Sequence, residues 1–307
     1  GGILHALEGH CWGHRGNDRR IRSGVMIGHG VSYGALSVIN AIAMGKGAGF
    51  GIDLKTEATV RLTTEPEIVV EIDGHPSEDT RLARFSVEEM LRRYPDSGMR
   101  GAVITTSSNI PISQGLKSSS ATTNAILAAT ADALGVTLDP LEIGRIGATV
   151  AIAAGVSITG TFDDACACML GGLVFTDNPK RELLHRSPMP EGYTAVIHLP
   201  EFQIRKSAFP KERMREMADE VTAAYDRALA GDVFGAMYAN GVCTCRALGI
   251  EPEAADRALA CGAAGAGLSG TGPATGILVE TDRLDAFLDA FGREHVIVAN
   301  VRNGDAV

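Results

Sequence analysis

Apolar and polar residues alternate in several short stretches, and this pattern predicts a series of strands. Residues 47–63 partly alternate over a long run, and residues 67–73 are expected to pair with them as a neighbouring strand. Residues 102–106 form another short strand-like segment. Four further strands are predicted at residues 173–176, 193–199, 274–279 and 296–301. The chain is therefore expected to contain an extensive sheet.

Segments with helical spacing separate these strands. Ser86 and Glu89 have the spacing of a capping box, which predicts a short helix that ends at residues 94–95. Residues 121–134 form an Ala-rich helix that Gly135 terminates. Further helices are predicted at residues 140–155, 211–230, 234–248, 252–261 and 283–291. Strands mixed with helical hairpins in this way favour an α+β fold.

The pattern also divides the chain into parts. Residues 1–22 have no apolar periodicity, so we expect a loose extension there. Its cluster of potential metal ligands fits a disordered extension better than a metal site: His5, His10, Cys11 and His14. The predicted organisation is an extension at residues 1–22, an N-terminal domain at residues 23–177 and a C-terminal domain at residues 178–307.

Composition excludes several classes of function. Hydrophobic residues make up 45% of the chain and charged residues 21%, as in ordinary globular proteins. The formal net charge is -9 and no basic run is present, so nucleic acid is not an expected partner. No apolar segment is long enough to span a membrane, and we expect a cytoplasmic protein. Its two C-x-C pairs lie in Ala-rich contexts without a matching His, which favours buried reduced thiols over a zinc site.

The sharpest chemical signal is a Ser-rich loop before the Ala-rich helix. Gly115 lets the backbone approach an anion closely, and the Ser residues add hydroxyl donors at a helix start, where the helix dipole favours negative charge. Lys117 adds a mobile cation, while Ser118 and Ser119 can reach a Mg²⁺ ion that bridges phosphates. A Ser-rich N-cap is the simpler alternative, and a Walker A motif is absent. We predict that ATP binds to Pro111, Ile112, Ser113, Gln114, Gly115, Leu116, Lys117, Ser118, Ser119, Ser120 and Ala121.

This loop, PISQGLKSSSA, resembles the phosphate-binding motif of GHMP kinases, P-x-x-x-G-L-x-S-S-x-A. The form GLKSSSA is similar to that of the archaeal-type shikimate kinases, and residues 32–57 and 265–274 resemble their N-terminal segment and third motif. The resemblance covers roughly residues 24–307. It implies the two-domain GHMP fold, with an S5-like, β-rich α/β N-terminal domain and a ferredoxin-like α+β C-terminal domain.

The third motif has two readings. Alone, it indicates only a flexible turn before a strand. Beside the Ser-rich loop, the resemblance implies that it packs against the phosphates or the acceptor. Its residues are Gly267, Leu268, Ser269, Gly270, Thr271 and Gly272.

The candidate catalytic acid follows a Gly turn. Asp163 and Asp164 precede an apolar, Cys-containing stretch, and on the residues alone an acidic N-cap pair is an equally good interpretation. The segment is similar to the Gly-x-Asp-Asn-Ala motif of mevalonate-type GHMP kinases, which implies that Asp163 is the catalytic base and Lys117 its catalytic partner. Several relatives place a Mg²⁺-binding Glu on the preceding helix, but residues 143–162 contain no acid here.

The resemblance implies ATP-dependent phosphorylation of the 3-hydroxyl of shikimate, a step of chorismate and aromatic amino-acid biosynthesis. Another GHMP kinase, such as homoserine kinase, is the alternative enzyme, and a non-catalytic metabolite-binding regulator is the alternative of another class. A carboxylate ligand favours Arg or Lys, and the candidates are Arg205, Lys206 and Arg246. Lys46 and Lys55 are expected either near the site or on the surface. The sequence indicates no oligomeric state.

Overall fold

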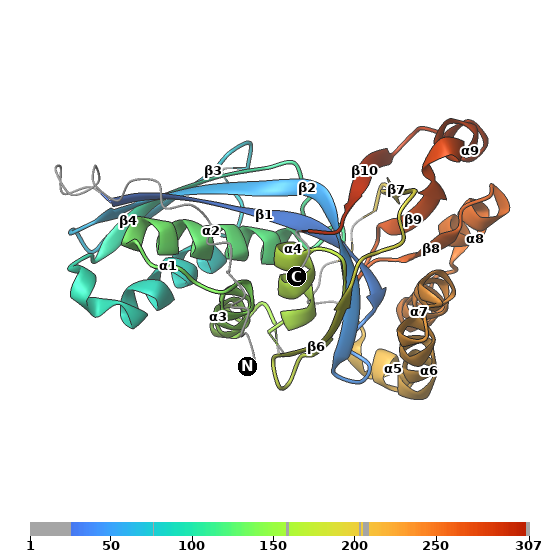
Figure 1. Cartoon of the computed structure of the whole chain (residues 1–307), viewed down its shortest axis with the longest axis horizontal. Helices are drawn as coiled ribbons and strands as arrows, with labels where there is room; N and C mark the ends of the chain where they lie inside the picture. The colour runs from blue at the N-terminus through green and yellow to red at the C-terminus, as the bar shows by residue number, and fades with distance from the viewer. Residues whose placement is uncertain (1–25, 76, 158–159, 203, 205–208, 305–307) are drawn as a thin grey trace, which may run out of the picture.

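The computed structural model describes residues 26–75, 77–157, 160–202, 204 and 209–304 (Figure 1). Its strands are β1 (Met26–Ile39), β2 (Lys46–Thr63), β3 (Ile68–Ile72), β4 (Gly101–Ser108), β5 (Leu173–Asp177), β6 (Glu182–Ser187), β7 (Tyr193–His198), β8 (Gly265–Leu268), β9 (Thr275–Glu280) and β10 (Val296–Arg302). Its α-helices are α1 (Arg81–Arg93), α2 (Ser118–Leu134), α3 (Pro140–Ala153), α4 (Phe162–Leu170), α5 (Lys211–Arg215), α6 (Ala218–Leu229), α7 (Val233–Leu248), α8 (Glu253–Ala260) and α9 (Leu284–Phe291). No described helix is both long and apolar enough to cross a membrane.

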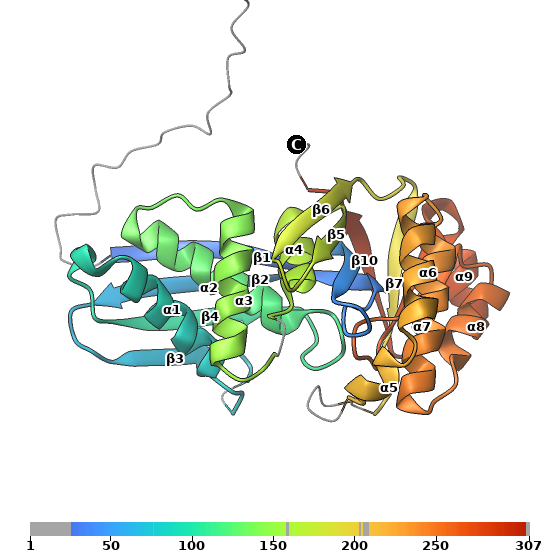
Figure 2. The ribbon, with the colours of Figure 1, turned by 90° about the horizontal axis from the view of Figure 1, so that it is seen from below.

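The N-terminal half is built around β2, the long strand that the alternation predicted. β2 pairs antiparallel with β1, β4 and β5, and the helices α1 to α4 lie on one side of this sheet (Figures 1 and 2). The predicted pairing of residues 67–73 with this strand is wrong, because β3 pairs parallel with β4, which lies between β3 and β2. Helix α1 connects β3 to β4, so these elements form a βαβ unit rather than a hairpin.

Helix α2 packs directly on the backbone of β1. A Cβ atom at Gly28 would lie only 2.1 Å from the carbonyl oxygen of Ala129, and one at Gly30 would lie 2.1 Å from that of Ala125. The helix therefore approaches the strand as closely as its backbone permits. Gly28 and Gly30 therefore serve the close packing of a helix on a strand, and not turns.

The C-terminal half has the topology expected of a ferredoxin-like domain. Its four strands follow one another in the spatial order β10-β7-β9-β8, and each adjacent pair is antiparallel. Along the chain the elements alternate as strand, helices, two strands, helix and strand. The α+β GHMP fold class is therefore confirmed in this half as in the first.

One hydrophobic core joins the two halves. The buried cluster contains Phe50, Phe162 and Phe175 from the first half together with Ile197 and Met237 from the second. The sheet is also continuous, because β10 pairs with the middle of β2. The domain boundary near residues 177–179 stays a prediction.

Several predicted element boundaries need correction. The Ser86 capping box is wrong: α1 already begins at Arg81, and the Ser86 hydroxyl donates to the carbonyl of Leu82 inside the helix. The single helix predicted at residues 211–230 is two helices, α5 and α6, with a break at residues 216–217. Strands β1, β6 and β8 and the helical state of residues 118–120 were not predicted. The predicted extension at residues 1–22 lies outside the described residues.

Candidate active site

A cavity of about 740 Å³ lies where the two halves of the protein meet. Its walls come from the β1–β2 turn, the Ser-rich loop, the start of α4, helix α5 and the third motif. Its polar, charged and glycine lining includes Ser37, Asn40, Arg81, Gly115, Lys117, Ser118, Ser119, Asp163, Asp164, Asn178, Lys211, Arg215 and Gly270. Segments distant in the sequence thus meet around one space of the size that small-molecule sites have.

The Ser-rich loop presents the start of α2 to the cavity. Lys117 is the N-cap in a left-handed conformation, and no side chain caps this end of the helix. The first amide groups of α2 lack helical partners, so they and the hydroxyls of Ser118 and Ser119 form a site suited to an anion. This placement supports the predicted phosphate site over a self-satisfied Ser-rich cap.

Not all of the predicted ATP-binding residues reach this space. Ser113 and Gly115 line the cavity with Lys117, Ser118 and Ser119. The remaining members of the loop have other positions, since Leu116 and Ala121 are buried in the core, Ser120 faces a small neighbouring cavity, and Pro111, Ile112 and Gln114 do not line the main one.

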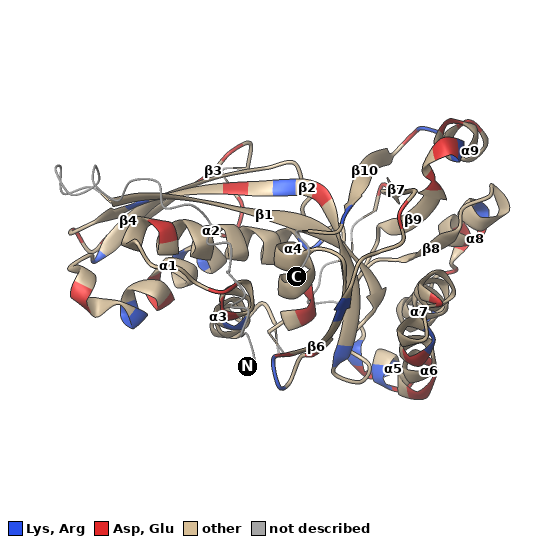
Figure 3. Ribbon diagram, viewed as in Figure 1, with Lys and Arg blue, Asp and Glu red and all other residues tan. Residues whose placement is uncertain are grey.

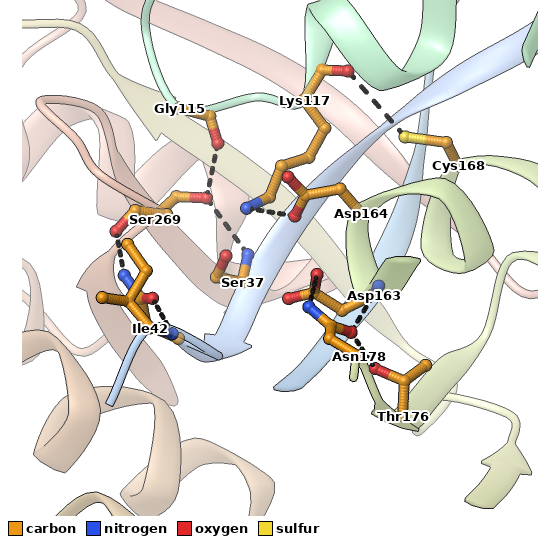
Figure 4. A network of polar contacts seen from close by, with 12 residues as sticks. Ser37, Ile42, Gly115, Lys117, Asp163, Asp164, Cys168, Thr176, Asn178 and Ser269 are labelled. Carbon is orange, nitrogen blue, oxygen red and sulfur yellow. Dashed lines mark hydrogen bonds and ion pairs between the residues drawn. The ribbon is translucent and has the colours of Figure 1, made fainter. Parts of the chain in front are cut away.

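Lys117 forms a buried ion pair with Asp164. The Nζ atom lies 2.7 Å from Oδ1 of Asp164, and the two side chains are only 8% and 9% exposed (Figure 4). Burial alone would lower the pKa of Lys117, but Asp164 and Asp163 together outweigh burial and raise that pKa. Lys117 therefore carries a fixed positive charge beside the start of α2.

Asp163 has a different environment from its neighbour. The Nδ2 atom of Asn178 donates to Oδ1 of Asp163 at 2.7 Å, and the backbone N–H of Asp163 donates to Oδ1 of Asn178 at 3.0 Å (Figure 4). Burial and the adjacent Asp164 raise the pKa of Asp163 to about 6, although Lys117 and Asn178 oppose this shift. The two neighbouring carboxyls thus differ in environment: Asp164 pairs with the lysine, whereas Asp163 is hydrogen-bonded to Asn178 and has a raised pKa.

The third motif is clamped to the Ser-rich loop. The buried hydroxyl of Ser269 donates to the carbonyl of Gly115 at 2.9 Å and accepts the backbone N–H of Ser37 at 3.1 Å. Gly267 and Leu268 belong to β8, whereas Gly270, Thr271 and Gly272 line the cavity. The flexible-turn interpretation is therefore incomplete, since this loop has specific partners.

Two glycines permit this clamp. A Cβ atom at Gly115 would lie 2.3 Å from the carbonyl oxygen of Ser269, and one at Gly270 would lie 2.9 Å from Nζ of Lys117. Both also have positive φ angles, of 87° and 62°. A side chain at Gly115 would push the two loops apart, and one at Gly270 would displace the ammonium of Lys117.

We expect Ser269→Ala to destabilise the protein by about 1–3 kcal/mol, because it leaves the N–H of the buried Ser37 and the partly buried carbonyl of Gly115 without this partner. Urea denaturation measures the loss. Thr64→Ala is the matched control, since the exposed Thr64 hydroxyl contacts only the neighbouring Glu65. Equal midpoints for the two variants would contradict the clamp.

A smaller cavity of about 30 Å³ lies behind Ser119, between α2, α3 and α4. Asn124 on its wall is fully buried, and its Nδ2 atom donates to the carbonyl of Ala165 at 3.0 Å. The Oδ1 atom of Asn124 has no hydrogen-bond partner among the described residues. Ser119 and Thr161 line both cavities, so this small space borders the main one, and we call it the annex.

Several site residues were not found by sequence reasoning. Asn178 was assigned to the domain boundary, yet it holds Asp163. Asn40 was also not predicted, although its side chain donates to the carbonyl of Gly270 and accepts the N–H of Ile42. Asn residues after strands are ordinary turn formers, so no local signal distinguished these two.

Of the predicted carboxylate-binding residues, the structure argues against Arg246 and leaves Arg205 and Lys206 as predictions. Arg246 does not line the cavity and pairs with Glu220 at 2.8 Å, while Arg205 and Lys206 lie outside the described residues. Lys55 pairs with Glu57, and Lys46 lies over the ring of Tyr225, so neither lines the cavity. The cavity instead contains Arg81, Lys211 and Arg215.

None of the described cysteines lines the cavity, although Sγ of Cys168 donates to the carbonyl of Lys117 at 4.0 Å (Figure 4). The described cysteines are free thiols: Cys166, Cys168, Cys243, Cys245 and Cys261. Burial raises the pKa of Cys245 to about 11, so this thiol is protonated at neutral pH. Cys11 lies outside the described residues.

Known proteins resemble this chain in sequence and in fold. Residues 81–172 match the family model "GHMP kinases N terminal domain". The shikimate kinase of Methanothrix thermoacetophila is 43% identical over 285 residues, covering 92% of this chain and 96% of that protein. The shikimate kinase of Methanosarcina acetivorans is 42% identical, with 91% and 96% coverage.

Solved structures agree on the fold. The mevalonate kinase of Methanococcus jannaschii superposes with a TM-score of 0.72 at 19% identity, covering 92% of this chain and 100% of that one. The homoserine kinase of Cytophaga hutchinsonii gives 0.70 at 19% identity, with 91% and 96% coverage. With sequence identity above 40% along most of its length, the chain belongs to the archaeal shikimate kinase family of the GHMP kinases.

Proposed function

We propose that this protein is a shikimate kinase, which transfers the γ-phosphoryl group of ATP to the 3-hydroxyl of shikimate. One observation carries the proposal. The start of α2, which has no side-chain cap, lies around the same cavity as Asp163 and Asp164, whose carboxyls have different environments. Phosphoryl transfer needs positioning, neutralisation of charge and an acceptor for the hydroxyl proton. The cavity supplies a group for each of these requirements.

Lys117 and the start of α2 bind the phosphates of ATP. The free amides of the first helical turn and the ammonium of Lys117 neutralise charge on the phosphoryl oxygens. Asp164 keeps the ammonium in place through its 2.7 Å contact, so little reorganisation is needed when the nucleotide binds. Ser118 and Ser119 add hydroxyl donors at the same point.

Asp163 is the general base. As the bond between the shikimate O3 atom and the γ-phosphorus forms, the bond to the ADP oxygen breaks, and the hydroxyl proton passes to the carboxylate of Asp163. With a pKa of about 6, this carboxyl is mostly ionised at neutral pH and is still basic enough to take the proton. Asn178 fixes its orientation through two hydrogen bonds.

The residues around Ser119 fit a hydrated Mg²⁺ ion. Ser118 and Ser119 would hold it together with phosphate oxygens, and the free Oδ1 atom of Asn124 in the annex provides an acceptor for a water of its shell. Mg²⁺ keeps several waters and needs few protein ligands, so the absence of an acid from residues 143–157 and 160–162 is compatible with this ion. When bound, the ion neutralises phosphate charge.

The test is a comparison of acceptors. We expect the purified protein to form ADP from ATP and Mg²⁺ rapidly with shikimate, and slowly or not at all with homoserine, mevalonate or no acceptor. Phosphorus NMR of the product should show a new phosphate monoester on the 3-hydroxyl. Turnover that prefers homoserine would identify the alternative kinase, and nucleotide binding without turnover on any acceptor would identify a regulator.

A further inference from the structure

Four cationic side chains line the described part of the cavity wall: Arg81, Lys117, Lys211 and Arg215. Three of them already have carboxylate partners. Lys117 pairs with Asp164 at 2.7 Å, Arg81 with Asp79 at 2.6 Å and Arg215 with Glu212 at 2.6 Å. Lys211 lies within ion-pair distance of none of the described carboxylates, so it is the cation of this wall that remains available to a ligand.

Lys211 lines the cavity from helix α5. The carboxyl of Asp163 rests against the first residues of β2, because a Cβ atom at Gly47 would lie 2.4 Å from its Oδ2 atom. The turn before β2 lies beside helix α5, as Figures 1 and 2 both show, and basic residues mark this turn and helix in Figure 3. Lys211 is the first residue of α5. The helix that carries this free cation therefore lies beside the turn that leads to the Asp163 contact.

The phosphates of ATP have their own cation. Lys117 and the amides at the start of α2 take up that role, so a second ammonium on a different helix suits a different anion. Shikimate carries a carboxylate on ring carbon 1 and the reacting hydroxyl on ring carbon 3, only one ring atom apart, so a cation and a base must both reach the same six-membered ring. A compact ammonium binds a carboxylate by a charge-assisted hydrogen bond.

We infer that Lys211 binds the carboxylate of the acceptor while the hydroxyl faces Asp163. This assignment rests on the proposed function and makes Lys211 a determinant of specificity for acidic alcohols. Arg215, one turn further along α5, contributes less because its guanidinium is held by Glu212.

The experiment measures steady-state kinetics of Lys211→Gln with shikimate and with its methyl ester. We expect the KM for shikimate to rise on the order of 10- to 100-fold, as for loss of a hydrogen bond to a charged group, while the KM for ATP stays within a factor of about 2. Wild-type enzyme should prefer the acid to the ester by a similar factor, and Lys211→Gln should lose that preference. Lys211→Arg should retain part of it.

Arg213→Gln is the matched control. Arg213 lies on the same helix, but it does not line the cavity and donates instead to the carbonyl of Arg246. This variant should keep the wild-type KM for shikimate. If Lys211→Gln kept the preference for the acid, or if the KM for ATP rose instead, the assignment of Lys211 would be wrong, but the proposed function would not be affected. Absence of shikimate turnover in the wild-type enzyme would overturn the proposed function, and the assignment with it.

Discussion

Asp163→Asn is expected to lower kcat on the order of 100- to 10,000-fold while the fold and ATP binding persist. Asn has the size of Asp and can still accept the hydrogen bond from Asn178, but it cannot take the proton of the shikimate hydroxyl. Single-turnover measurements with saturating ATP and shikimate give the rate of the chemical step directly. Nucleotide affinity, measured by calorimetry, should remain close to that of the wild type.

The pH profile provides an independent signature of the same residue. In the free wild-type enzyme, kcat/KM should fall as the pH drops below about 6, where Asp163 becomes protonated. Because the pKa in the folded protein lies above the ordinary value of 3.8, the stability that protonation provides is lost as pH rises from about 4 to 6. The residual kcat/KM of Asp163→Asn should therefore no longer fall as the pH drops below about 6. At pH 8 this variant should be at least as stable as the wild type.

Asp164→Asn separates the two carboxyls. It removes the partner of the buried Lys117, so we expect a clear loss of stability together with a smaller loss of rate than in Asp163→Asn. A larger loss of rate in Asp164→Asn would identify Asp164 as the base. If both variants lost little activity, the carboxyls would act only as helix caps.

Lys117→Met is expected to abolish most turnover and also to destabilise the protein by about 3–5 kcal/mol, because it leaves the buried carboxylate of Asp164 without its cation. The Met side chain fills similar space but neutralises no phosphate charge. Urea denaturation measures the stability, and calorimetry with an ATP analogue measures the affinity, which should fall. Lys55→Met is the matched control, since its partner Glu57 is exposed and the denaturation midpoint should not change measurably.

The double variant Lys117→Met/Asp164→Asn distinguishes stability from catalysis. Removing both charges should restore most of the stability that Lys117→Met loses, because no buried charge then remains unpaired. Turnover should stay low, since the cation at the start of α2 is still missing. Recovery of activity together with stability would show that Lys117 has only a structural role.

Local sequence patterns predicted the parts of the site that lie on continuous segments. The Ser-rich loop and the Asp pair each occupy a helix start, and the residues that form such a start are adjacent in the chain. The long alternation of β2 likewise identified that strand within one residue. These features depend on residues that are adjacent in the sequence, so a local pattern can predict them.

Features that depend on distant partners were not predicted. The pairing of β3 with β4 follows from the crossover through α1, whereas proximity in sequence favoured a pairing with β2. Asn178 gains its role only because β5 ends beside α4, and Lys211 only because α5 lies against the cavity. Neither residue differs in its local context from an ordinary turn or surface residue.

The bridge through Ser269 constrains when the enzyme can become active during its synthesis. It joins residues 37, 115 and 269, so the phosphate loop lacks its clamp until most of the chain has left the ribosome. The N-terminal half can begin to fold earlier, as usually happens during translation. Before residue 269 has been synthesised, the nascent chain lacks this contact with the Ser-rich loop. We therefore expect the protein to consume ATP only after the third motif has been made.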